Sequence, residues 1–275
     1  MTPNFIGVTG LPRAGSTLLC QLLAQHPDIH CEGHSSPLCN AMLAMRRFVS
    51  DDQFMLAQLD RSFEASYGHL HSAMEGFVRG WYGDAGGKKA LVDKNRAWLH
   101  CIETLLAIVP EAKLVVCIRE LGQIYGSIEA QHQKTILLDF IDHLADYDRF
   151  GRADVLFAKD KAVGAPLVSV HAVQDLPPEV QKRLYFLRFE DLMDRPVECM
   201  AHVFQWLALS PHRIDPKKLA VGIQESDSHY RMKYLHRQSA SIEKPKAHAI
   251  PPRIQAQIET ACAWYYQIYY PTKKQ

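Results

Sequence analysis

The chain has 275 residues, of which 47% are hydrophobic and 22% are charged, and its formal net charge is +1. This composition supports one sizeable core and predicts a single domain over residues 1–275. A net charge near zero excludes a global attraction to nucleic acid or to an anionic membrane. No apolar run approaches the roughly 20 residues that cross a bilayer, and the start lacks a signal-peptide pattern. The seven cysteines have no zinc-ligand spacing, so we expect reduced thiols, no metal centre and a cytoplasmic protein.

Four apolar segments are expected to form buried parallel strands, each followed by helical material: residues 5–9, 90–93, 113–118 and 184–189. This alternation predicts an α/β fold in which helices flank a parallel sheet. The insertion at about 37–83 has helical periodicity and predicts a helical cap beside the sheet, where it could line an acceptor pocket. Its Met, Phe, Trp81 and Tyr82 side chains suggest an acceptor with apolar surface, although ordinary packing also explains them.

The turn after the first predicted strand reads Gly10-Leu-Pro-Arg-Ala-Gly15-Ser16-Thr17 and precedes an apolar, helix-like run. A glycine-rich turn between a strand and a helix presents unpaired N–H groups to an anion. Ser16 stands where ATP- and GTP-binding loops place a lysine, so the nucleotide is not expected to be ATP. The strong positive charge in the turn is Arg13, whose planar guanidinium can grip a tetrahedral oxyanion.

A second pair of polar residues follows the third predicted strand. Arg119 comes directly after that strand, and Ser127 lies eight residues later in a helix-like segment. In an α/β sheet, ligands bind beyond the carboxyl ends of the strands. We therefore expect Arg119 and Ser127 to reach one common anion.

Together these motifs resemble the sulfotransferase family that uses 3′-phosphoadenosine-5′-phosphosulfate (PAPS). The turn matches the family's 5′-phosphosulfate loop, and Arg119 with Ser127 matches its 3′-phosphate motif. The wider pattern is similar to the protein-tyrosine sulfotransferase branch, and the resemblance covers roughly positions 4 to 208. The residues that carry this wider likeness are His26-Pro27, Cys31, Lys94, Pro110-Glu-Ala-Lys113 and the run Leu187 to Leu192.

The resemblance implies metal-independent transfer of a sulfuryl group from PAPS to a hydroxyl or amine of a small-molecule acceptor, leaving 3′-phosphoadenosine-5′-phosphate (PAP). It implies that Arg13 and the turn amides hold the 5′-phosphate and that Lys94 contacts the bridging oxygen. A basic segment that includes Arg231, Lys233, His236, Arg237 and Lys246 is expected to close over the phosphates, and Phe189 or Trp98 could stack on adenine. The implied cofactor-binding set is Pro12, Arg13, Ala14, Gly15, Ser16, Thr17, Arg119, Ser127 and Lys244.

The base that removes the acceptor proton has two candidates. The tyrosine-sulfotransferase branch places a catalytic glutamate shortly after its His-Pro segment, and this chain has His34 at that position. Neutral imidazole is a competent base near pH 7, so the departure is chemically tolerable. Glu32 lies two residues away and could serve instead. Neither the acceptor nor the oligomeric state can be determined from the sequence, although the aromatic end of the last predicted helix could form an interface.

Two other functions remain open at this level. A P-loop kinase would need a loop lysine and a carboxylate for magnesium at a strand end. Ser16 argues against the first requirement, whereas Asp93 could meet the second. A nucleotide-binding protein without turnover is the other alternative, because the expected glutamate is absent.

Overall fold

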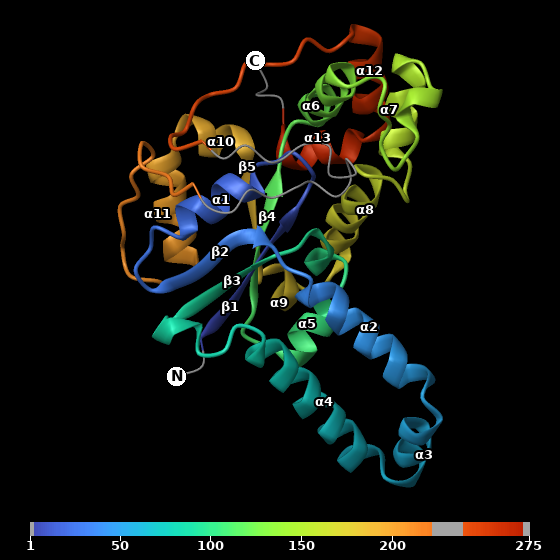
Figure 1. Cartoon of the computed structure of the whole chain (residues 1–275), viewed down its shortest axis with the longest axis vertical. Coiled ribbons are helices and arrows are strands. Elements are labelled where there is room, and N and C mark those ends of the chain that lie inside the picture. Colours follow the sequence, from blue (N-terminus) through green and yellow to red (C-terminus); the bar gives the residue numbers. More distant parts are fainter. Residues whose placement is uncertain (1–2, 222–238, 272–275) are drawn as a thin grey trace.

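Five parallel strands form one sheet in the order β2-β3-β1-β4-β5 (Figure 1). The structure is a computed structural model and describes residues 3–221 and 239–271. Its central strands are almost entirely buried and are rich in Val, Leu and Ile, as expected when helices cover both faces of a sheet. The predicted α/β fold with a parallel sheet is confirmed. The strands are β1 (Asn4–Gly10), β2 (Ile29–Ser35), β3 (Ala90–Lys94), β4 (Lys113–Ile118) and β5 (Leu184–Arg188).

Strand β2 is absent from the four strands expected from the sequence. Its residues, Ile-His-Cys-Glu-Gly-His-Ser, contain no apolar run, and most of them are only partly buried. The strand lies at the edge of the sheet, where it pairs only with β3. An edge strand can keep polar side chains in contact with water, so the apolar pattern that identifies central strands does not apply to it.

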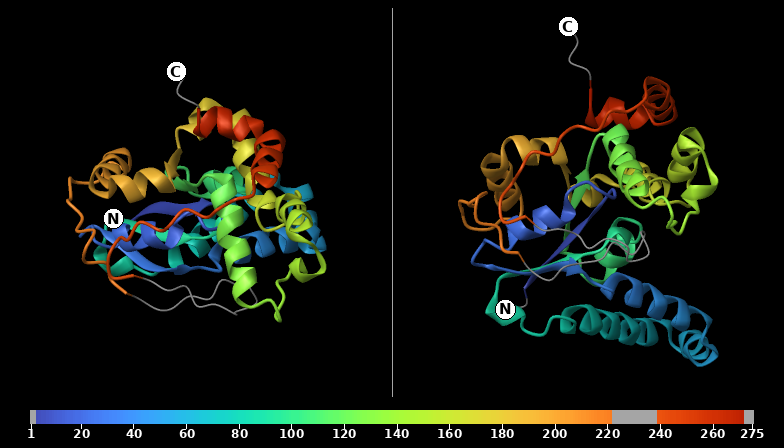
Figure 2. Two further views of the ribbon diagram at one scale, coloured as in Figure 1. Left: turned by 90° about the horizontal axis from the view of Figure 1, so that it is seen from above. Right: turned by 45° about the horizontal axis from the view of Figure 1, so that its top comes forward.

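Helices cover the sheet on both sides (Figures 1 and 2). Helix α1 packs on β2, β1 and β3, whereas α8 and the short helix η2 pack on β1. The C-terminal helix α12 lies beside α6. The α-helices are α1 (Ser16–Leu23), α2 (Leu38–Asp51), α3 (Gln53–Arg61), α4 (Phe63–Gly80), α5 (Ile102–Ile108), α6 (Leu121–Lys134), α7 (Arg149–Phe157), α8 (Gly164–Ala172), α9 (Pro178–Gln181), α10 (Phe189–Asp194), α11 (Pro196–Trp206), α12 (Pro252–Ala261) and α13 (Ala263–Tyr269), and the short 3-10 helices are η1 (Ala85–Gly87), η2 (Arg96–Leu99), η3 (Leu144–Asp146) and η4 (Val173–Asp175).

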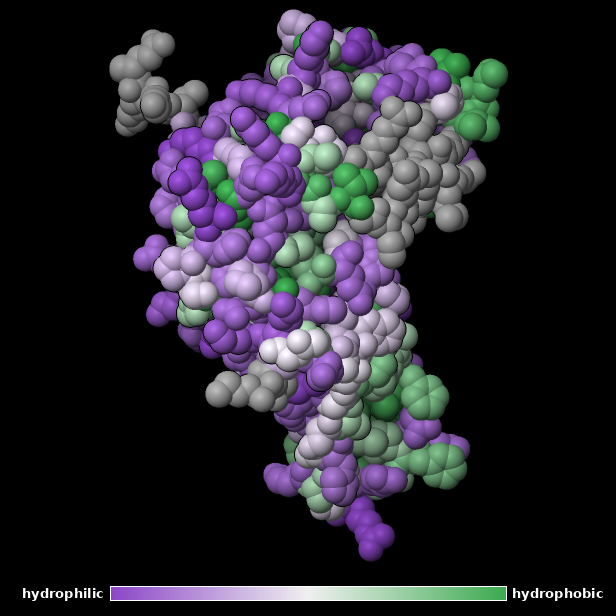
Figure 3. All heavy atoms as spheres, turned by 60° about the vertical axis from the view of Figure 1, so that its left-hand side comes forward, coloured by the Kyte–Doolittle hydropathy of each residue, from purple (hydrophilic) through white to green (hydrophobic). Residues whose placement is uncertain are grey.

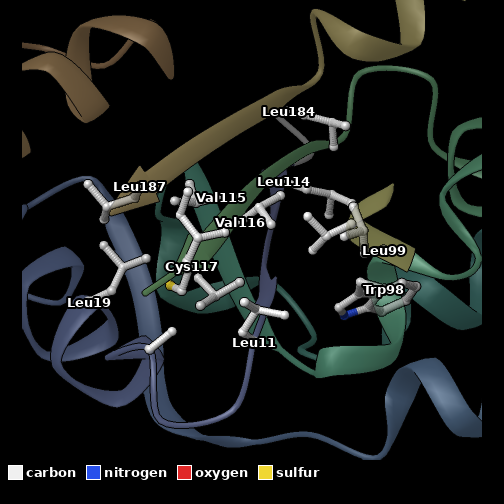
Figure 4. Close-up of a cluster of buried hydrophobic side chains, with 14 of the residues drawn as sticks. Leu11, Leu19, Trp98, Leu99, Leu114, Val115, Val116, Cys117, Leu184 and Leu187 are labelled. Carbon is white, nitrogen blue, oxygen red and sulfur yellow. The ribbon is translucent and has the colours of Figure 1, made fainter. Parts of the chain in front are cut away.

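The core has two layers, one on each side of β4 (Figure 4). Successive side chains of a strand point to opposite faces, so Val115 and Cys117 meet Leu19 of α1 on one side. On the other side Leu114 lies near Trp98 of η2, whose side chain is fully buried in the core. Close packing on both faces holds β4 in place. The turn at its carboxyl end is therefore also held in position.

The insertion after β2 is helical, as predicted, and consists of α2, α3 and α4. These helices form an arm that extends away from the sheet (Figure 1), and no residue of α3 is buried. Large apolar side chains of the arm, such as Phe48 and Phe54, are 68% and 71% exposed. Figure 3 shows hydrophobic side chains gathered along one side of this arm. The arm is therefore anchored beside the sheet at its base, and its outer helix α3 extends beyond the core.

Candidate active site

The glycine turn after β1 is held against the neighbouring strand. Gly10 has a φ of 116°, and a Cβ atom there would lie 2.2 Å from the carbonyl oxygen of Cys117. The next amide, that of Leu11, donates to the same carbonyl across 2.9 Å. A side chain at position 10 would separate the turn from β4, so glycine is required at this close approach.

Helix α1 begins at the end of this turn with its amides facing outward. Gly15 caps the helix with a φ of 87°, and no side chain caps it. The first hydrogen bond of the helix joins the amide of Leu19 to the carbonyl of Gly15. The amides of the first turn, from Ser16 onward, therefore have no partner within the helix and can bind an anion.

The two sequence motifs meet in space. Arg13, with a left-handed φ of 59°, donates from Nε to the hydroxyl oxygen of Ser127 across 3.1 Å. Arg119 donates from Nη1 to the carbonyl of Arg13 across 2.9 Å. Burial lowers the pKa of Arg119, although the nearby carboxylate of Glu190 opposes the shift. The expectation that Arg119 and Ser127 share one site is therefore supported by their geometry.

The Phe189 ring packs against this site. The guanidinium of Arg119 lies 4.5 Å from the centre of the Phe189 ring, a cation–π arrangement that orients the arginine. A Cβ atom on Gly15 would lie 2.6 Å from the same ring. Trp98, the other residue considered for adenine stacking, is buried in the core and donates to Asp93. Of the two aromatic candidates, only Phe189 contacts the site.

These residues line a cavity of about 350 Å³, which we call the donor pocket. Four lining residues are Arg or Lys, and among the described residues that line it none is Asp or Glu. The cavity is therefore a strongly positive site within a chain of almost no net charge, which is the electrostatic requirement for a polyanionic ligand. Its lining residues are Leu11, Pro12, Arg13, Gly15, Ser16, Thr17, Arg96, Arg119, Ser127, Ala130, Gln131, Lys134, Phe189, Pro245 and His248.

The sequence analysis missed several of these residues. Gln131 and Lys134 lie four and seven positions after Ser127 on α6, so they share its helical face. That spacing was readable in the sequence and could have identified them. His248 carried no such signal, because it reaches the pocket through a bond between its backbone amide and Gln123. Burial and the charges of Arg119 and Arg13 lower the pKa of His248.

Lys94 lies at the end of β3 and contacts the start of α1. Its ammonium group donates to the Thr17 hydroxyl across 3.2 Å and to the Gly33 carbonyl across 3.4 Å. The side chain is buried, with 7% exposure. This position places a cation beside Thr17 in the first turn of α1, and the role of Lys94 at the bridging oxygen stays a prediction.

His34 and Glu32 lie on the edge strand β2, two residues apart. Nε2 of His34 is 3.4 Å from Oε2 of Glu32, and Nε2 of His30 is 3.7 Å from Oε1 of the same carboxylate. Among the described atoms, Nδ1 of His34 is buried and has no hydrogen-bond partner. Neither His34 nor Glu32 lines the donor pocket. Both instead adjoin Gly33, whose carbonyl contacts Lys94.

Two predicted cofactor residues lie apart from the pocket lining. Ala14 is buried under the turn, with 3% exposure. Lys244 forms an ion pair with Asp194, and its side chain is 72% exposed, whereas its neighbour Pro245 does line the pocket. The other basic residues named for this segment, Arg231, Lys233, His236 and Arg237, lie outside the described residues; Lys246 is described and exposed.

A second and larger cavity of about 860 Å³ lies beyond the ends of β2 and β3, and we call it the polar cavity. Arg96 lines both this cavity and the donor pocket. From the arm insertion, only Pro37 and Asn40 contribute. Trp81 and Tyr82, which had suggested an apolar acceptor, do not line it. The lining residues are Ser35, Ser36, Pro37, Asn40, Asn95, Arg96, Ala97, His100, Ile141, Asp142, Asp160, Lys161, Ala162, Ala165, Pro166 and Ser169.

The sequence profile of the sulfotransferase family matches residues 3–213 of this chain. The chain belongs to the sulfotransferase family. A curated relative, the nodulation protein NoeE of Sinorhizobium fredii (strain NBRC 101917 / NGR234), is 27% identical over 248 residues, which are 82% of this chain and 54% of NoeE. The chain thus spans about half the length of the curated relative that it matches. The predicted family is confirmed, whereas the likeness to the protein-tyrosine branch stays a prediction.

Solved structures share the fold of this sulfotransferase at low sequence identity. The sulfotransferase domain from the curacin biosynthetic pathway has a TM-score of 0.52 at 16% identity and covers 95% of this chain and 98% of its own. A sulfotransferase from Alicyclobacillus acidocaldarius has a TM-score of 0.53 at 14% identity, covering 96% and 92%. Retinol dehydratase, solved in complex with androsterone and inactive cofactor PAP, has a TM-score of 0.50 at 12% identity, covering 98% and 82%.

Asp93, the carboxylate that a kinase would need for magnesium, is fully buried in this sulfotransferase. One of its oxygens accepts from Trp98 Nε1 across 2.6 Å and the other accepts from the Tyr82 hydroxyl across 2.8 Å. Burial raises the pKa of Asp93, although hydrogen bonds from Ser36, Trp98 and Tyr82 oppose the shift. This carboxylate holds the core together and does not point into the donor pocket. Across residues 3–221 and 239–271, no helix combines the length and the apolar character needed to span a membrane.

Proposed function

We propose that this sulfotransferase moves the sulfuryl group of PAPS to a hydroxyl or amine of a small-molecule acceptor, without a metal ion. The donor pocket carries the proposal, because the amides of α1, Arg13, Arg119 and Ser127 converge on one cavity whose described lining contains cations and no carboxylates. Retinol dehydratase, which shares the fold, was solved with PAP. When bound, PAPS supplies an electrophilic sulfur joined to a good leaving group.

The residues of the pocket divide into two groups. Arg119 and Ser127 hold the 3′-phosphate. Lys134, which lies two turns further along the same face of α6, adds a third contact. Arg13 and the amides of the first turn of α1 hold the 5′-phosphate. These cations replace the metal that kinases use to neutralise the transferred group, because preorganised donors in a partly buried site stabilise developing charge strongly.

Lys94 stabilises the leaving group. In the transfer, the acceptor oxygen forms a bond to sulfur while the bond from sulfur to the phosphate oxygen breaks, and the acceptor proton passes to a base. Negative charge develops on the phosphate oxygen that is released. The ammonium group of Lys94, fixed by Thr17 at the start of α1, neutralises that oxygen.

His34 and Glu32 together supply the base. The carboxylate of Glu32 holds the Nε2 proton of His34 and thereby selects the tautomer in which Nδ1 carries the lone pair. Nδ1 accepts the proton of the acceptor. This atom is buried, so the His34 ring has to turn to present Nδ1 to an acceptor in the polar cavity, whose lining begins at the next residue, Ser35.

Nucleotide binding tests the donor. We expect PAP to raise the melting temperature without magnesium and more strongly than Mg-ATP does, because Ser16 replaces the lysine that Mg-ATP sites use. Arg119→Ala should weaken PAP binding at least tenfold in calorimetry. Arg195→Ala, which removes an exposed arginine paired with Glu198, is the matched control and should leave affinity unchanged. A preference for Mg-ATP would favour a kinase and overturn the assignment.

Turnover separates the enzyme from a nucleotide-binding homologue. We expect transfer of labelled sulfate from PAPS to an acceptor, and His34→Ala should lower kcat by about 10²-fold with PAP affinity retained. His30→Ala is the matched control, because His30 lies on the same strand and faces the same carboxylate. Full activity of His34→Ala would shift the role of base to Glu32. Tight PAP binding without turnover on any acceptor would instead indicate a binding protein.

A further inference from the structure

The polar cavity borders the donor pocket, and this arrangement gives it a role in the same reaction. The two cavities share Arg96, which follows β3 directly and opens η2. A ligand in the polar cavity therefore lies next to the end of the donor pocket. Carboxyl ends of neighbouring strands are where α/β enzymes bring two substrates together. The inference below rests on the proposed function of the donor pocket.

Ten of the sixteen described residues that line the polar cavity have polar or titratable side chains. Three serines, two asparagines and five charged or titratable side chains line it, and His100 carries the one aromatic ring among the described lining residues. A flat phenolic or steroidal acceptor would need aromatic or broad aliphatic walls to replace water. The described wall offers hydrogen-bond donors and acceptors beside small apolar side chains instead, which match a ligand with many hydroxyl groups.

Fixed geometry on this wall supports recognition rather than loose solvation. Asn95 donates from Nδ2 to the Ser36 carbonyl across 2.8 Å, and its Oδ1 accepts from the Ala97 amide across 2.9 Å. On the facing segment, Lys161 lies 3.6 Å from Asp142. Side chains that are held in this way present their remaining hydrogen-bonding positions in defined directions.

The charges of the two cavities also differ. The donor pocket has four Arg or Lys residues and no described carboxylate in its lining, whereas the polar cavity places Asp142 and Asp160 among Arg96, Lys161 and His100. Carboxylates repel an anionic acceptor, and the mixed charges give no net preference for a cation. The wall therefore favours a neutral ligand.

We infer that the polar cavity is the acceptor site and that it binds a neutral, polyhydroxylated acceptor, a carbohydrate of one to a few sugar units. Its volume of about 860 Å³ lies within the range of small-molecule sites. Asn40 and Ser169, from α2 and α8, contact the acceptor from opposite segments of the wall. Neither belongs to the donor pocket, so they affect acceptor binding alone.

The test compares acceptor classes with the intact chain. Wild-type protein is given labelled PAPS with neutral mono- and oligosaccharides, with simple phenols and with a steroid alcohol. We expect sulfated saccharide as the main product. Asn40→Leu should raise the saccharide KM at least tenfold while kcat and PAP affinity stay within twofold of wild type. Ser50→Leu, an exposed serine further along α2, is the matched control and should change neither value.

Each outcome decides one level of the assignment. Failure to bind PAP overturns the proposed function, whatever the acceptor. PAP binding with faster transfer to phenol or steroid, or with no sulfated saccharide at all, leaves the donor site intact and overturns the carbohydrate assignment. An unchanged saccharide KM in Asn40→Leu, with PAP bound normally, shows that the acceptor binds elsewhere.

Discussion

The hydroxyl of Tyr265 donates a hydrogen bond to the backbone carbonyl of Arg119 across 2.8 Å. Tyr265 is fully buried, and it comes from α13, near the described end of the chain. Two neighbouring tyrosines also donate hydrogen bonds to residues near this site: Tyr266 to Glu120 and Tyr270 to Glu190. The aromatic end of the last helix had suggested an intermolecular interface. Within the chain, these tyrosines support the strand end that carries Arg119, and an interface at this helix stays a prediction.

Tyr265→Phe tests this support. The change leaves a buried carbonyl without its donor, which costs about 1–3 kcal/mol of unfolding free energy. It should also weaken PAP binding severalfold, because Arg119 then loses the fixed backbone from which its side chain extends. Denaturant unfolding and calorimetry measure the two effects.

Tyr269→Phe is the matched control for this variant. Its hydroxyl accepts from Gln174 Nε2 of η4 across 2.8 Å and not from the strand end that carries Arg119. It should lower stability with little change in PAP affinity. Equal losses of PAP affinity in both variants would show that the tyrosines act through the whole helix and not through Arg119.

Gly15→Ala tests the close approach of the turn to Phe189. The added methyl group would lie 2.6 Å from the ring, at a φ of 87°. We expect loss of PAP binding by at least tenfold, together with a stability cost of about 1–2 kcal/mol for the left-handed backbone. Gly83→Ala carries a similar backbone cost, since Gly83 has a φ of 60°, but nothing lies within 4 Å of its Cβ position. PAP affinity lost equally in both variants would contradict the specific contact.

The sequence predicted the donor side of the site better than the acceptor side. Arg13, Arg119 and Ser127 could be found because each follows a strand with a buried, mostly apolar run, and parallel strands end at one edge of the sheet. Strand β2 was missed because an edge strand need not be apolar. Residues such as His248 could not be predicted, because His248 lies in a loop. The sequence of a loop has no periodic pattern that would indicate where it packs.

The position of the arm shows a second limit. Helical periodicity in residues 37–83 correctly predicted helices, because it reports which side of a helix is apolar. It does not report where a helix packs. Phe48 and Phe54 belong to such a pattern and yet are exposed, so the apolar character of the insertion stays a prediction about the acceptor and does not locate its site.

Proton uptake on nucleotide binding tests His248. In the free protein burial and the nearby Arg119 and Arg13 lower its pKa below the ordinary value of histidine. A bound phosphate reverses that field and raises the pKa, so binding takes up a proton between the two values. PAP affinity should therefore rise as pH falls from the bound-state pKa to the free-state pKa.

Calorimetry in buffers of different ionisation enthalpy measures this uptake directly. His248→Gln removes the titrating group and keeps a polar side chain, so the variant should show less proton uptake than wild type at pH 6.5. The phosphates of PAP titrate in the same range, and the difference between the two proteins isolates the histidine. Identical uptake in both would mean that His248 stays neutral in the complex.

The ion pair between Glu129 and Arg152 joins α6, which carries four of the fifteen described residues that line the donor pocket, to α7. Arg152 donates to both carboxylate oxygens, across 2.8 Å and 2.7 Å, and both side chains are buried. Burial alone would raise the pKa of Glu129, but hydrogen bonds from Arg152 and Gln133 outweigh it and lower the pKa. The pair therefore stabilises the fold above the ordinary pKa of glutamate, and this stabilisation is lost as pH falls through the lowered value.

Arg152→Met should lower the free energy of unfolding by about 3 kcal/mol at neutral pH, because a buried carboxylate then loses its paired cation and keeps only the Gln133 bond and the more distant Arg149. The loss should shrink as pH falls, since protonation of Glu129 removes the unpaired charge. Arg195→Met, at an arginine whose partners are exposed, should cost less than about 1 kcal/mol at any pH. Denaturant unfolding from pH 4 to pH 8 measures both. A loss in Arg152→Met that does not change with pH would show that the arginine contributes through packing of its side chain rather than through the ion pair.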